Sequence, residues 1–484
     1  MAEQNTEGLV TFGIAQISGY LPLLRLDRKA VARDLAWSGL AMPRSGHRAL
    51  AGWDEDPLTM AVEAARGLCD GTAPTALRFA STSAYFTDRA QSAIALDALA
   101  LPRSVRTADS ANARRAGVSA LYDALTAGRD EIVMAAEKRQ TQPGSAAQLA
   151  FGDGAAAVRT GSGAPARLVG LASLSHDFID RYASVEHPCS YAYEERFVRD
   201  VAVAEFYVPA VRAACKSAGI TPAQLAHVAC AEPAPATWRA AAKALQCSAP
   251  NHCEVLTERA GDLGVAHPLF GLGLALAAAR PGDYVLVAGF GSGIDTLVFQ
   301  VLAPVPGSAA MVVALAEGEV LSNTARFLSL NGSLALDWGM RAEFEQKAQA
   351  TVLERVGRDM IGFIGGRDSL GNVQFPKSTM PVNPLLDQPE VQEDVRLADM
   401  EATVVSVTAD RLNFTPDPPF DFGLVQFDNG ARVLMEMVDR PGAGFAVGDR
   451  VRMRLRIKSR NARLGFRTYF WKAAPLARPV LENA

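Results

Sequence analysis

Apolar residues in the N-terminal part of the chain form short runs that alternate with helix-like segments. Residues 8–20 (GLVTFGIAQISGY) and 76–83 (ALRFASTS) are typical of strands, whereas 54–67 (DEDPLTMAVEAARG) predicts an amphipathic helix with an acidic start. The run 284–288 (YVLVA) has no polar alternation, which predicts a strand covered on both faces. Strands and helices in this alternation predict an α/β fold.

One stretch, 107–125 (TADSANARRAGVSALYDAL), predicts a polar turn at 109–112 followed by a helix rich in alanine and leucine. A strand-turn-helix elbow of this kind is where many acyl-transfer enzymes place a nucleophile, at the positive end of a helix. Here the elbow carries Arg114 and Arg115 instead. Two cations at a helix N-terminus are unfavourable unless an anion meets them. The pair therefore indicates either a binding feature or a lost catalytic site.

Two parts of the sequence resemble each other: 119–137 with 151–161, and 270–291 with 291–302. Each has a small-residue helix, a turn containing Arg, Gly and Asp, a strand, and a glycine turn into another strand. This repetition predicts a duplicated βα unit with a pseudo-twofold relation. We expect Asp153 and Asp295 to occupy equivalent glycine turns and to stabilise them.

The C-terminal part has a different pattern. Residues 309–364 begin with an apolar, strand-like run, and a charged helix is predicted over 340–356. From 398 onwards short strands alternate with turns, and Asp428-Asn429-Gly430 is a hairpin signal. These short strands predict a small barrel, most simply an OB-fold. Between the repeats, 175–195 is rich in Asp, Tyr, His and Ser, which is typical of either a substrate-contacting insertion or a solvated loop.

The charge, hydropathy and cysteine content of the chain argue against several classes of protein. A net charge of −4 over 484 residues gives no electrostatic case for nucleic acid as a partner. No apolar run is long enough to span a bilayer, and the first ten residues (MAEQNTEGLV) lack a signal-peptide pattern, so we expect a cytoplasmic protein with no membrane partner. The six cysteines form no CxxC pair, which is typical of free thiols.

Several motifs make the chain resemble the thiolase superfamily, in particular 3-hydroxy-3-methylglutaryl-CoA (HMG-CoA) synthases of the archaeal and bacterial type. They are AGWDEDPLTMAVEAA (51–65), ASTSAYF (80–86), ANARRAG (111–117), FGDGAAAV (151–158) and GDLGVAHPLFGLGLAL (261–276). The C-terminal region is similar to the zinc-ribbon and OB-fold domain that accompanies many of these enzymes, through 406–433 and 447–456. The resemblance implies an α/β protein with a duplicated five-layer thiolase-like fold, followed by a small all-β OB-fold barrel.

The resemblance also implies domain boundaries. We expect an N-terminal thiolase-like half at 1–165, an insertion or linker at 166–205, a C-terminal thiolase-like half at 206–304, a connecting segment at 305–365, a degenerate zinc ribbon at 366–390 and an OB-fold domain at 391–484.

The chain departs from the family at its reactive positions. The family's nucleophilic cysteine falls at Arg114, which stays protonated and cannot attack a thioester. The general-base glutamate falls at Thr82, the histidine at Ala231, a lysine at Ala236, and the asparagine that orients a substrate carbonyl at Asp262. Arg114 is therefore expected to be neutralised by Glu232 or Asp262, to fill a former acyl pocket, or to bind a substrate carboxylate.

The zinc ribbon departs in the same way. Its cysteines fall at or near Arg367, Leu370, Pro381 and Leu386, none of which is a zinc ligand, so we expect no zinc. The remaining polar groups implied by motif position are His267, Asp262 and Tyr85 as catalytic candidates, and Arg114, Thr82 and Glu232 as substrate-binding or pocket residues. For His267 a structural, hydrogen-bonded role is the alternative, and for Tyr85 simple packing is the alternative.

Two functions remain open on this sequence. One is C–C bond formation or cleavage on acyl-CoA thioesters without an acyl-cysteine, which needs a base, an acid and an enolate-stabilising site. The other is a catalytically degenerate subunit that pairs, as a homodimer or heteromer, with a cysteine-bearing thiolase-fold homologue. A coenzyme A thioester is the expected ligand in both.

Overall fold

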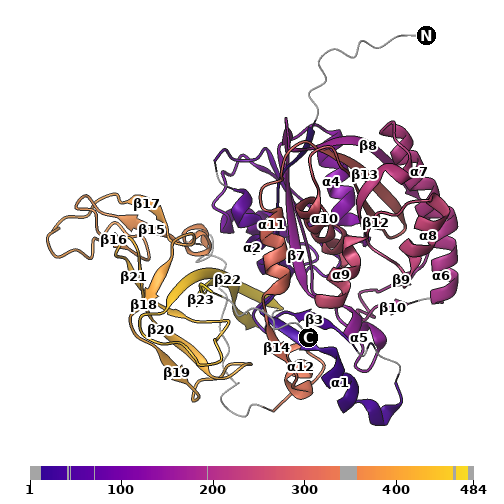
Figure 1. Ribbon diagram of the computed structural model, residues 1–484. Coiled ribbons are helices and arrows are strands. Elements are labelled where there is room, and N and C mark those ends of the chain that lie inside the picture. Colours follow the sequence, from indigo (N-terminus) through magenta and orange to yellow (C-terminus); the bar gives the residue numbers. More distant parts are fainter. Residues whose placement is uncertain are drawn as a thin grey trace.

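The protein consists of an α/β body and a C-terminal β part that packs against it (Figure 1). The computed structural model describes residues 12–40, 43, 45–69, 71–192, 194–337, 357–461 and 465–477. No helix within these ranges is long and apolar enough to cross a membrane.

The N-terminal half of the body is a mixed five-stranded unit in the order β1-β7-β6-β4-β5. Antiparallel pairs join β7 to both β1 and β6, and parallel pairs join β4 to both β6 and β5. The strands are β1 (Phe12–Tyr20), β4 (Ala76–Ala80), β5 (Arg106–Ser110), β6 (Glu131–Glu137) and β7 (Gly154–Ser162).

The C-terminal half repeats this pairing pattern in the order β8-β13-β12-β11. Its strands are β8 (Ala166–Ser175), β11 (Leu225–Cys230), β12 (Tyr284–Phe290) and β13 (Gly293–Val301). A single parallel bridge between Val228 and Asn251 stands where the first half has β5. The Asn251 side chain accepts from the Cys230 N–H and donates to the Cys230 carbonyl, both at 3.0 Å, which holds this segment along the edge of β11. The predicted duplication is confirmed.

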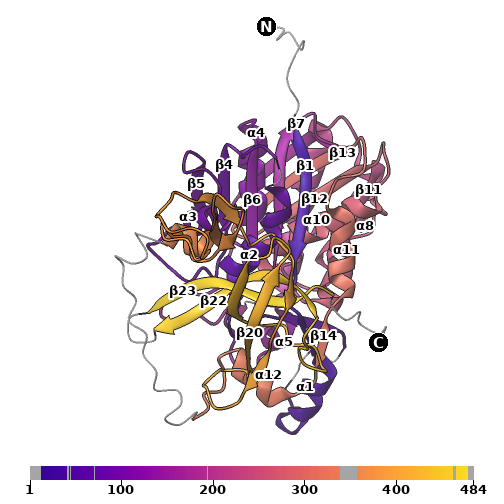
Figure 2. The same ribbon diagram turned by 90° about the vertical axis from the view of Figure 1, so that its left-hand side faces the viewer.

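Helices lie on both outer faces of the body and between its two halves (Figure 2). The central layer contains α4 (Ala116–Thr126) and α10 (His267–Ala278). One outer face carries α2 (Pro57–Ala65) and α3 (Gln91–Ala98), and the other carries α7 (Val208–Ser217) and α8 (Thr237–Leu245). Gly117 is required in α4 because a Cβ there would lie 2.5 Å from the Val265 carbonyl oxygen. The expected five layers are therefore present.

Smaller elements complete the body. A separate sheet contains β2 (Leu24–Asp27), β3 (His47–Leu50) and β14 (Glu319–Leu321). A short hairpin is formed by β9 (Arg181–Tyr182) and β10 (Tyr191–Ala192). The helices are α1 (Arg28–Asp34), α5 (Ala146–Ala150), α6 (Glu195–Val201), α9 (His252–Arg259), α11 (Ser308–Ala316) and α12 (Thr324–Leu330).

Some local predictions were wrong. The apolar run after 308 is helix α11: its buried residues Ser308, Met311 and Leu315 lie three and four positions apart, as on one face of a helix, whereas Val312 and Val313 are about half exposed. Asp109 and Ser110 belong to strand β5, so the elbow turn starts two residues later than predicted, at 111. Asp295 lies inside β13 rather than in its glycine turn. The charged helix predicted over 340–356 falls outside the described residues.

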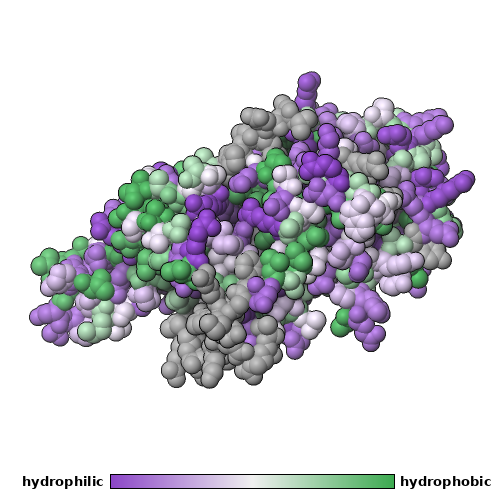
Figure 3. Space-filling model, turned by 90° about the horizontal axis from the view of Figure 1, so that it is seen from below, coloured by the Kyte–Doolittle hydropathy of each residue, from purple (hydrophilic) through white to green (hydrophobic). Residues whose placement is uncertain are grey.

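The C-terminal part is entirely β within the described residues from 364 onwards, and its main sheet has the order β19-β20-β18-β22-β23, with β21 on β20. The hairpin between β20 and β21 turns at Gly430, as predicted from Asp428-Asn429-Gly430. From below, apolar and hydrophilic residues are interspersed on the visible surface (Figure 3). The main strands are β18 (Ala402–Val404), β19 (Thr408–Asp410), β20 (Phe420–Phe427), β21 (Arg432–Glu436), β22 (Arg450–Asn461) and β23 (Phe466–Pro475); β15 (Ile364–Arg367), β16 (Val373–Gln374) and β17 (Glu393–Arg396) form a small separate sheet.

The acidic start of α2 is where the C-terminal part docks. Asp56 caps α2 by accepting from the Thr59 N–H at 3.1 Å, and the same carboxylate lies 2.9 Å from the Arg467 guanidinium of β23. Further along α2, Glu63 lies 2.7 Å from Arg454 of β22. Acidic residues at the start and near the end of α2 therefore both bind the C-terminal part.

Candidate functional site

The elbow between β5 and α4 holds its two arginines in different ion pairs. Arg115 lies 3.2 Å from Asp295, a buried residue of β13 that also accepts from the Ser173 hydroxyl at 2.6 Å. Arg114 pairs instead with Asp180, which precedes β9 in the segment between β8 and β11. Both cations at the helix N-terminus are thus met by carboxylates.

Arg114 is neutralised by Asp180 rather than by Glu232 or Asp262. Its side chain is 13% exposed and that of Asp180 only 5%. Burial and the neighbouring Arg181 guanidinium lower the pKa of Arg114 to about 9. Of the expected partners, Asp262 stabilises the cation from a greater distance.

Asp262 joins two more arginines to the elbow. Its carboxylate lies 3.3 Å from Arg139 and 3.5 Å from Arg181, and both guanidinium groups lie over the Phe151 ring, at 3.7 and 5.2 Å from its centre. Burial raises the pKa of Asp262, but the guanidinium charges of Arg139 and Arg181 outweigh burial and hold it far below its usual range. We call Arg114, Arg139, Arg181, Asp180 and Asp262 the arginine cluster.

Thr82 reaches the cluster through Glu137, at the end of β6. The Thr82 hydroxyl donates to the Glu137 carboxylate at 2.8 Å, and Ser81 donates to it at 3.1 Å. Arg139 lies 3.6 Å away on the other side. Burial raises the pKa of Glu137 despite these partners. Gly264 packs here with φ of +57°, and a Cβ at that position would lie 2.6 Å from the Glu137 side chain.

His267 uses both of its ring nitrogens inside the fold. Its Nδ1 lies 3.2 Å from the Leu263 amide and accepts that hydrogen, so Nε2 carries the proton and donates to Thr257 at 3.2 Å. Burial lowers the pKa of His267, which keeps the ring neutral. The ring is therefore adjacent to Asp262 but has no lone pair directed to a substrate.

Tyr85 and Glu232 lie apart from the arginine cluster. The Tyr85 ring lies beneath the Arg467 guanidinium at 3.5 Å, in contact with the C-terminal domain. Glu232 accepts from the Trp238 N–H at 2.6 Å near the start of α8, and burial raises its pKa.

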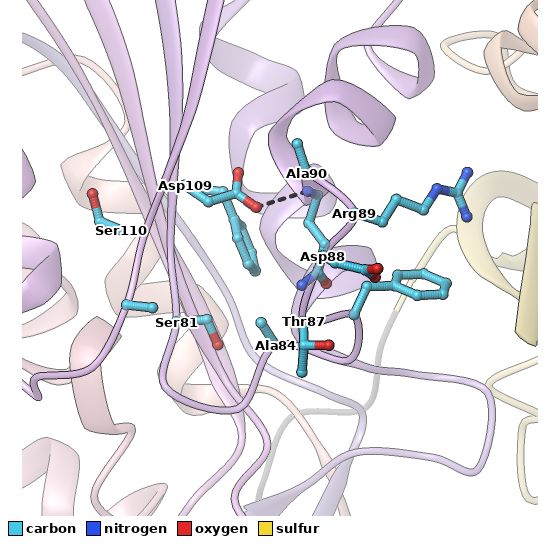
Figure 4. A pocket seen from close by; sticks show the side chains of 12 residues that line it. Ser81, Ala84, Thr87, Asp88, Arg89, Ala90, Asp109 and Ser110 are labelled. Atoms are coloured by element: carbon cyan, nitrogen blue, oxygen red, sulfur yellow. Dashed lines mark hydrogen bonds between the residues drawn. The ribbon is translucent and has the colours of Figure 1, made fainter. Parts of the chain in front are cut away.

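A cavity of about 270 Å³ opens on the other side of Ser81, beside the loop that carries Tyr85 (Figure 4). Asp109 borders it and holds the start of α3, accepting from the Gln91 and Ser92 amides at 2.8 and 3.0 Å. The close-up shows Asp88 and Arg89 on the loop side of this cavity and Asp109 and Ser110 on the strand side.

Comparison with known proteins identifies the two parts of the chain. Over 304 residues it is 26% identical to the hydroxymethylglutaryl-CoA synthase of Pyrococcus horikoshii, covering 60% of this chain and 86% of that protein. The enzyme of the same name from Caldivirga maquilingensis is 28% identical over 312 residues, covering 60% and 87%. The α/β body has a thiolase-like fold, and HMG-CoA synthases are its homologues.

Solved structures agree with this thiolase-like body. An HMG-CoA synthase complexed with CoA matches 70% of this chain and 95% of its own, with a TM-score of 0.55 and 14% identity. MvaS in complex with 3-hydroxy-3-methylglutaryl coenzyme A matches 66% and 91%, with a TM-score of 0.52 and 18% identity. Residues 394–456 match the family described as the ChsH2 C-terminal OB-fold domain. The predicted combination of a thiolase-like fold and an OB-fold is confirmed.

The small sheet of β15, β16 and β17, where the degenerate zinc ribbon was predicted, is held by contacts between side chains. Arg367 lies 3.2 Å from Glu393, and Gln392 donates to Gln374 at 3.0 Å. Within the described ranges, no group of three or more His, Cys, Asp or Glu residues could hold a metal ion. That this part of the chain binds no zinc stays a prediction.

Sequence reasoning missed most of the arginine cluster. Glu137 ends the buried strand β6 and Arg139 follows it two residues later; polar residues at the end of a buried strand were the signal that the sequence offered. Asp180 and Arg181 lie in the segment singled out for its polar composition, but nothing in the sequence showed that it folds back onto the elbow.

Proposed function

We propose that the thiolase-like body binds an acyl-CoA thioester without forming an acyl-enzyme, and that the chain serves as the partner of a cysteine-bearing thiolase-fold homologue. The observation that carries this proposal is the ion pair of Arg114 with Asp180 at the elbow. A protonated guanidinium cannot attack a thioester. The CoA ligand is supported by the names of the homologues and by the CoA and HMG-CoA bound to similar structures.

The candidates for proton transfer support the same proposal. His267 is hydrogen-bonded at both nitrogens, and the depressed pKa of Asp262 makes its carboxylate a weak base. Tyr85 packs under Arg467, away from the cluster. Each of these side chains already has a partner inside the fold, and a substrate would have to replace that partner before the side chain could transfer a proton.

The edge of the sheet at β5 offers a surface for the partner. Within the described residues no strand pairs with the outer side of β5, and Arg106 and Asp109 on it are exposed. An unpaired edge can add a strand from another chain. The partner would be a second copy of this chain or a homologue.

A second candidate function is C–C bond formation or cleavage without an acyl-cysteine. The three guanidinium groups of the arginine cluster favour it, because fixed cations stabilise an enolate oxygen as it forms. In a retro-aldol step a base would take the proton of a 3-hydroxyl group, the C2–C3 bond would break, and an acid would protonate the enolate carbon. His267, Asp262 and Tyr85 remain the candidates for these proton transfers.

The two functions are separated by assaying the chain alone and with a cysteine-bearing homologue. Calorimetry with acetyl-CoA should show binding, and radiolabelled acetyl-CoA should leave no covalent label on the chain. Turnover of a 3-hydroxyacyl-CoA should need the homologue. Turnover by this chain alone would establish the second candidate, and failure of acetyl-CoA and CoA to bind would overturn both.

A further inference from the structure

The carboxylate partners of the two elbow arginines lie in different parts of the fold. Asp295, the partner of Arg115, is built into the core strand β13. Asp180, the partner of Arg114, comes from a surface segment that leads into the β9–β10 hairpin. The first pair belongs to the scaffold, whereas the second joins the scaffold to a peripheral segment.

The β9–β10 hairpin is lightly attached beyond Asp180. Its strands have two residues each, and Tyr182, Tyr191 and Val185 are 55%, 61% and 94% exposed. Arg181 reaches inward to Asp262 at 3.5 Å and donates to the Pro233 carbonyl at 3.4 Å.

On its N-terminal side the segment is anchored by an apolar contact. Phe178 packs against Phe206 and Phe290, with ring centres 5.4 and 6.3 Å apart. Charged contacts thus hold the hairpin to the elbow, and aromatic contacts hold the base of the segment.

We propose that Arg114 is a binding site for the free carboxylate of an acyl-CoA whose acyl group ends in one, and that Asp180 occupies this site until the ligand replaces it. The ligand class is the monothioester of a dicarboxylic acid. This inference rests on the proposed acyl-CoA binding and specifies the acyl group.

Charge balance explains why the ligand must be an anion. A ligand carboxylate that takes the place of Asp180 leaves Arg114 paired, whereas an uncharged acyl group would leave a largely buried guanidinium without its anion. Arg139 stands on the far side of Asp262 and adds to the positive field. The cluster borders solvent, because the Asp262 side chain is 21% exposed and that of Arg181 is 16% exposed. Exchange requires the hairpin to lift, which also separates Arg181 from Asp262.

The test compares ligands that differ by a carboxylate. Succinyl-CoA and butyryl-CoA each have a four-carbon acyl group, and only succinyl-CoA carries a terminal carboxylate. CoA has no acyl group, so its affinity measures binding outside the acyl pocket. Affinities are measured by calorimetry for the wild type, Asp180→Asn, Arg114→Met and Arg114→Lys. Asp295→Asn is the matched control, because it removes the carboxylate partner of the neighbouring arginine.

We expect Asp180→Asn to bind succinyl-CoA about 10-fold more tightly than the wild type, and butyryl-CoA and CoA within about twofold, as for the gain of one charge-assisted hydrogen bond. Arg114→Met should abolish the preference for succinyl-CoA, and Arg114→Lys should retain it. Asp295→Asn should lower the melting temperature without changing that preference. In the wild type, amides 181–192 should lose hydrogen-exchange protection with succinyl-CoA but not with butyryl-CoA, a readout that needs no variant.

Three results would overturn the inference. Equal tightening of all three ligands by Asp180→Asn would mean that the hairpin is only a steric cover. Binding of CoA without any preference for succinyl-CoA in the wild type and Asp180→Asn would remove the carboxylate site and leave the proposed function standing. Binding of none of the three ligands would remove the proposed function as well.

Discussion

The ammonium group of Lys472 lies 2.9 Å from the carboxylate of Asp54, and both side chains are almost fully buried between the OB-fold domain and the thiolase-like body. Lys472 also lies 2.9 Å from Glu436, so one cation from β23 serves two carboxylates. Removing one partner of a buried ion pair leaves the other charge uncompensated. The resulting loss of folding stability exceeds the net stability that the intact pair contributes.

The first prediction concerns this interface. Lys472→Met removes the nearest cation from buried Asp54 and one of the two lysines that pair with Glu436, which keeps Lys458, and should lower the free energy of unfolding by about 3–5 kcal/mol. Asp54→Asn leaves Lys472 paired with Glu436, so it should lower the free energy of unfolding by only about 1–2 kcal/mol. Urea denaturation measures both. Lys377→Met, which breaks a more exposed pair with Asp394, is the control and should cost about 0.5 kcal/mol; similar losses in all three would contradict the prediction.

A second prediction follows from Glu63. Burial raises its pKa, but Arg66 and Arg454 outweigh burial and lower the pKa from 4.5 to about 2. A carboxyl group with a lowered pKa stabilises the fold above its unfolded pKa, and this contribution is lost as the pH falls from 4.5 towards 2. The difference in unfolding free energy between the wild type and Glu63→Gln should shrink by about 3 kcal/mol over that interval. A difference that does not vary with pH would rule out this assignment.

The third prediction separates structural from catalytic roles for His267. His267→Ala removes the acceptor of the Leu263 amide and should destabilise the fold by about 2–3 kcal/mol, measured by thermal and urea unfolding. Acetyl-CoA affinity should change less than about twofold, because the ring does not face a ligand. Thr257→Val removes only the hydroxyl group that bonds to Nε2 of His267, and it should lower the free energy of unfolding by about 1 kcal/mol. A stable His267→Ala protein that has lost turnover would instead assign a catalytic role.

The fourth prediction concerns His252, whose Nε2 lies 3.0 Å from Nδ1 of His227. Burial, and then the neighbouring His227, lower the pKa of His252 to about 4. NMR titration of the folded protein should give a midpoint near that value, and the unfolded chain should give one near 6.5. Since the folded pKa is the lower one, this histidine costs stability as the pH falls from 6.5 towards 4. His227→Gln should raise the midpoint slightly, because burial remains; an unchanged midpoint would show that the two rings do not interact.

The fold was largely predictable because its signals are local. The acidic start of α2, the duplicated glycine turns and the Asp428-Asn429-Gly430 hairpin are each set by neighbouring residues. The site was less predictable, since Arg114 and Asp180 are joined only by tertiary packing. The position of Arg114 at the elbow was read correctly, but its partner depends on how a surface segment folds back. The strand predicted at the start of 309–364 was wrong because a short apolar run does not by its composition distinguish a helix from a strand.

The short segment at Asn251 has a consequence for assembly. It lies along the outer side of β11 and takes hydrogen bonds that a further strand would need, whereas the opposite edge at β5 is open within the described chain. The sheet therefore has a single edge, at β5, where a strand of another chain can pair. Edge-to-edge growth can then join two chains and no more, so this geometry terminates a pair and excludes a fibre built along the sheet.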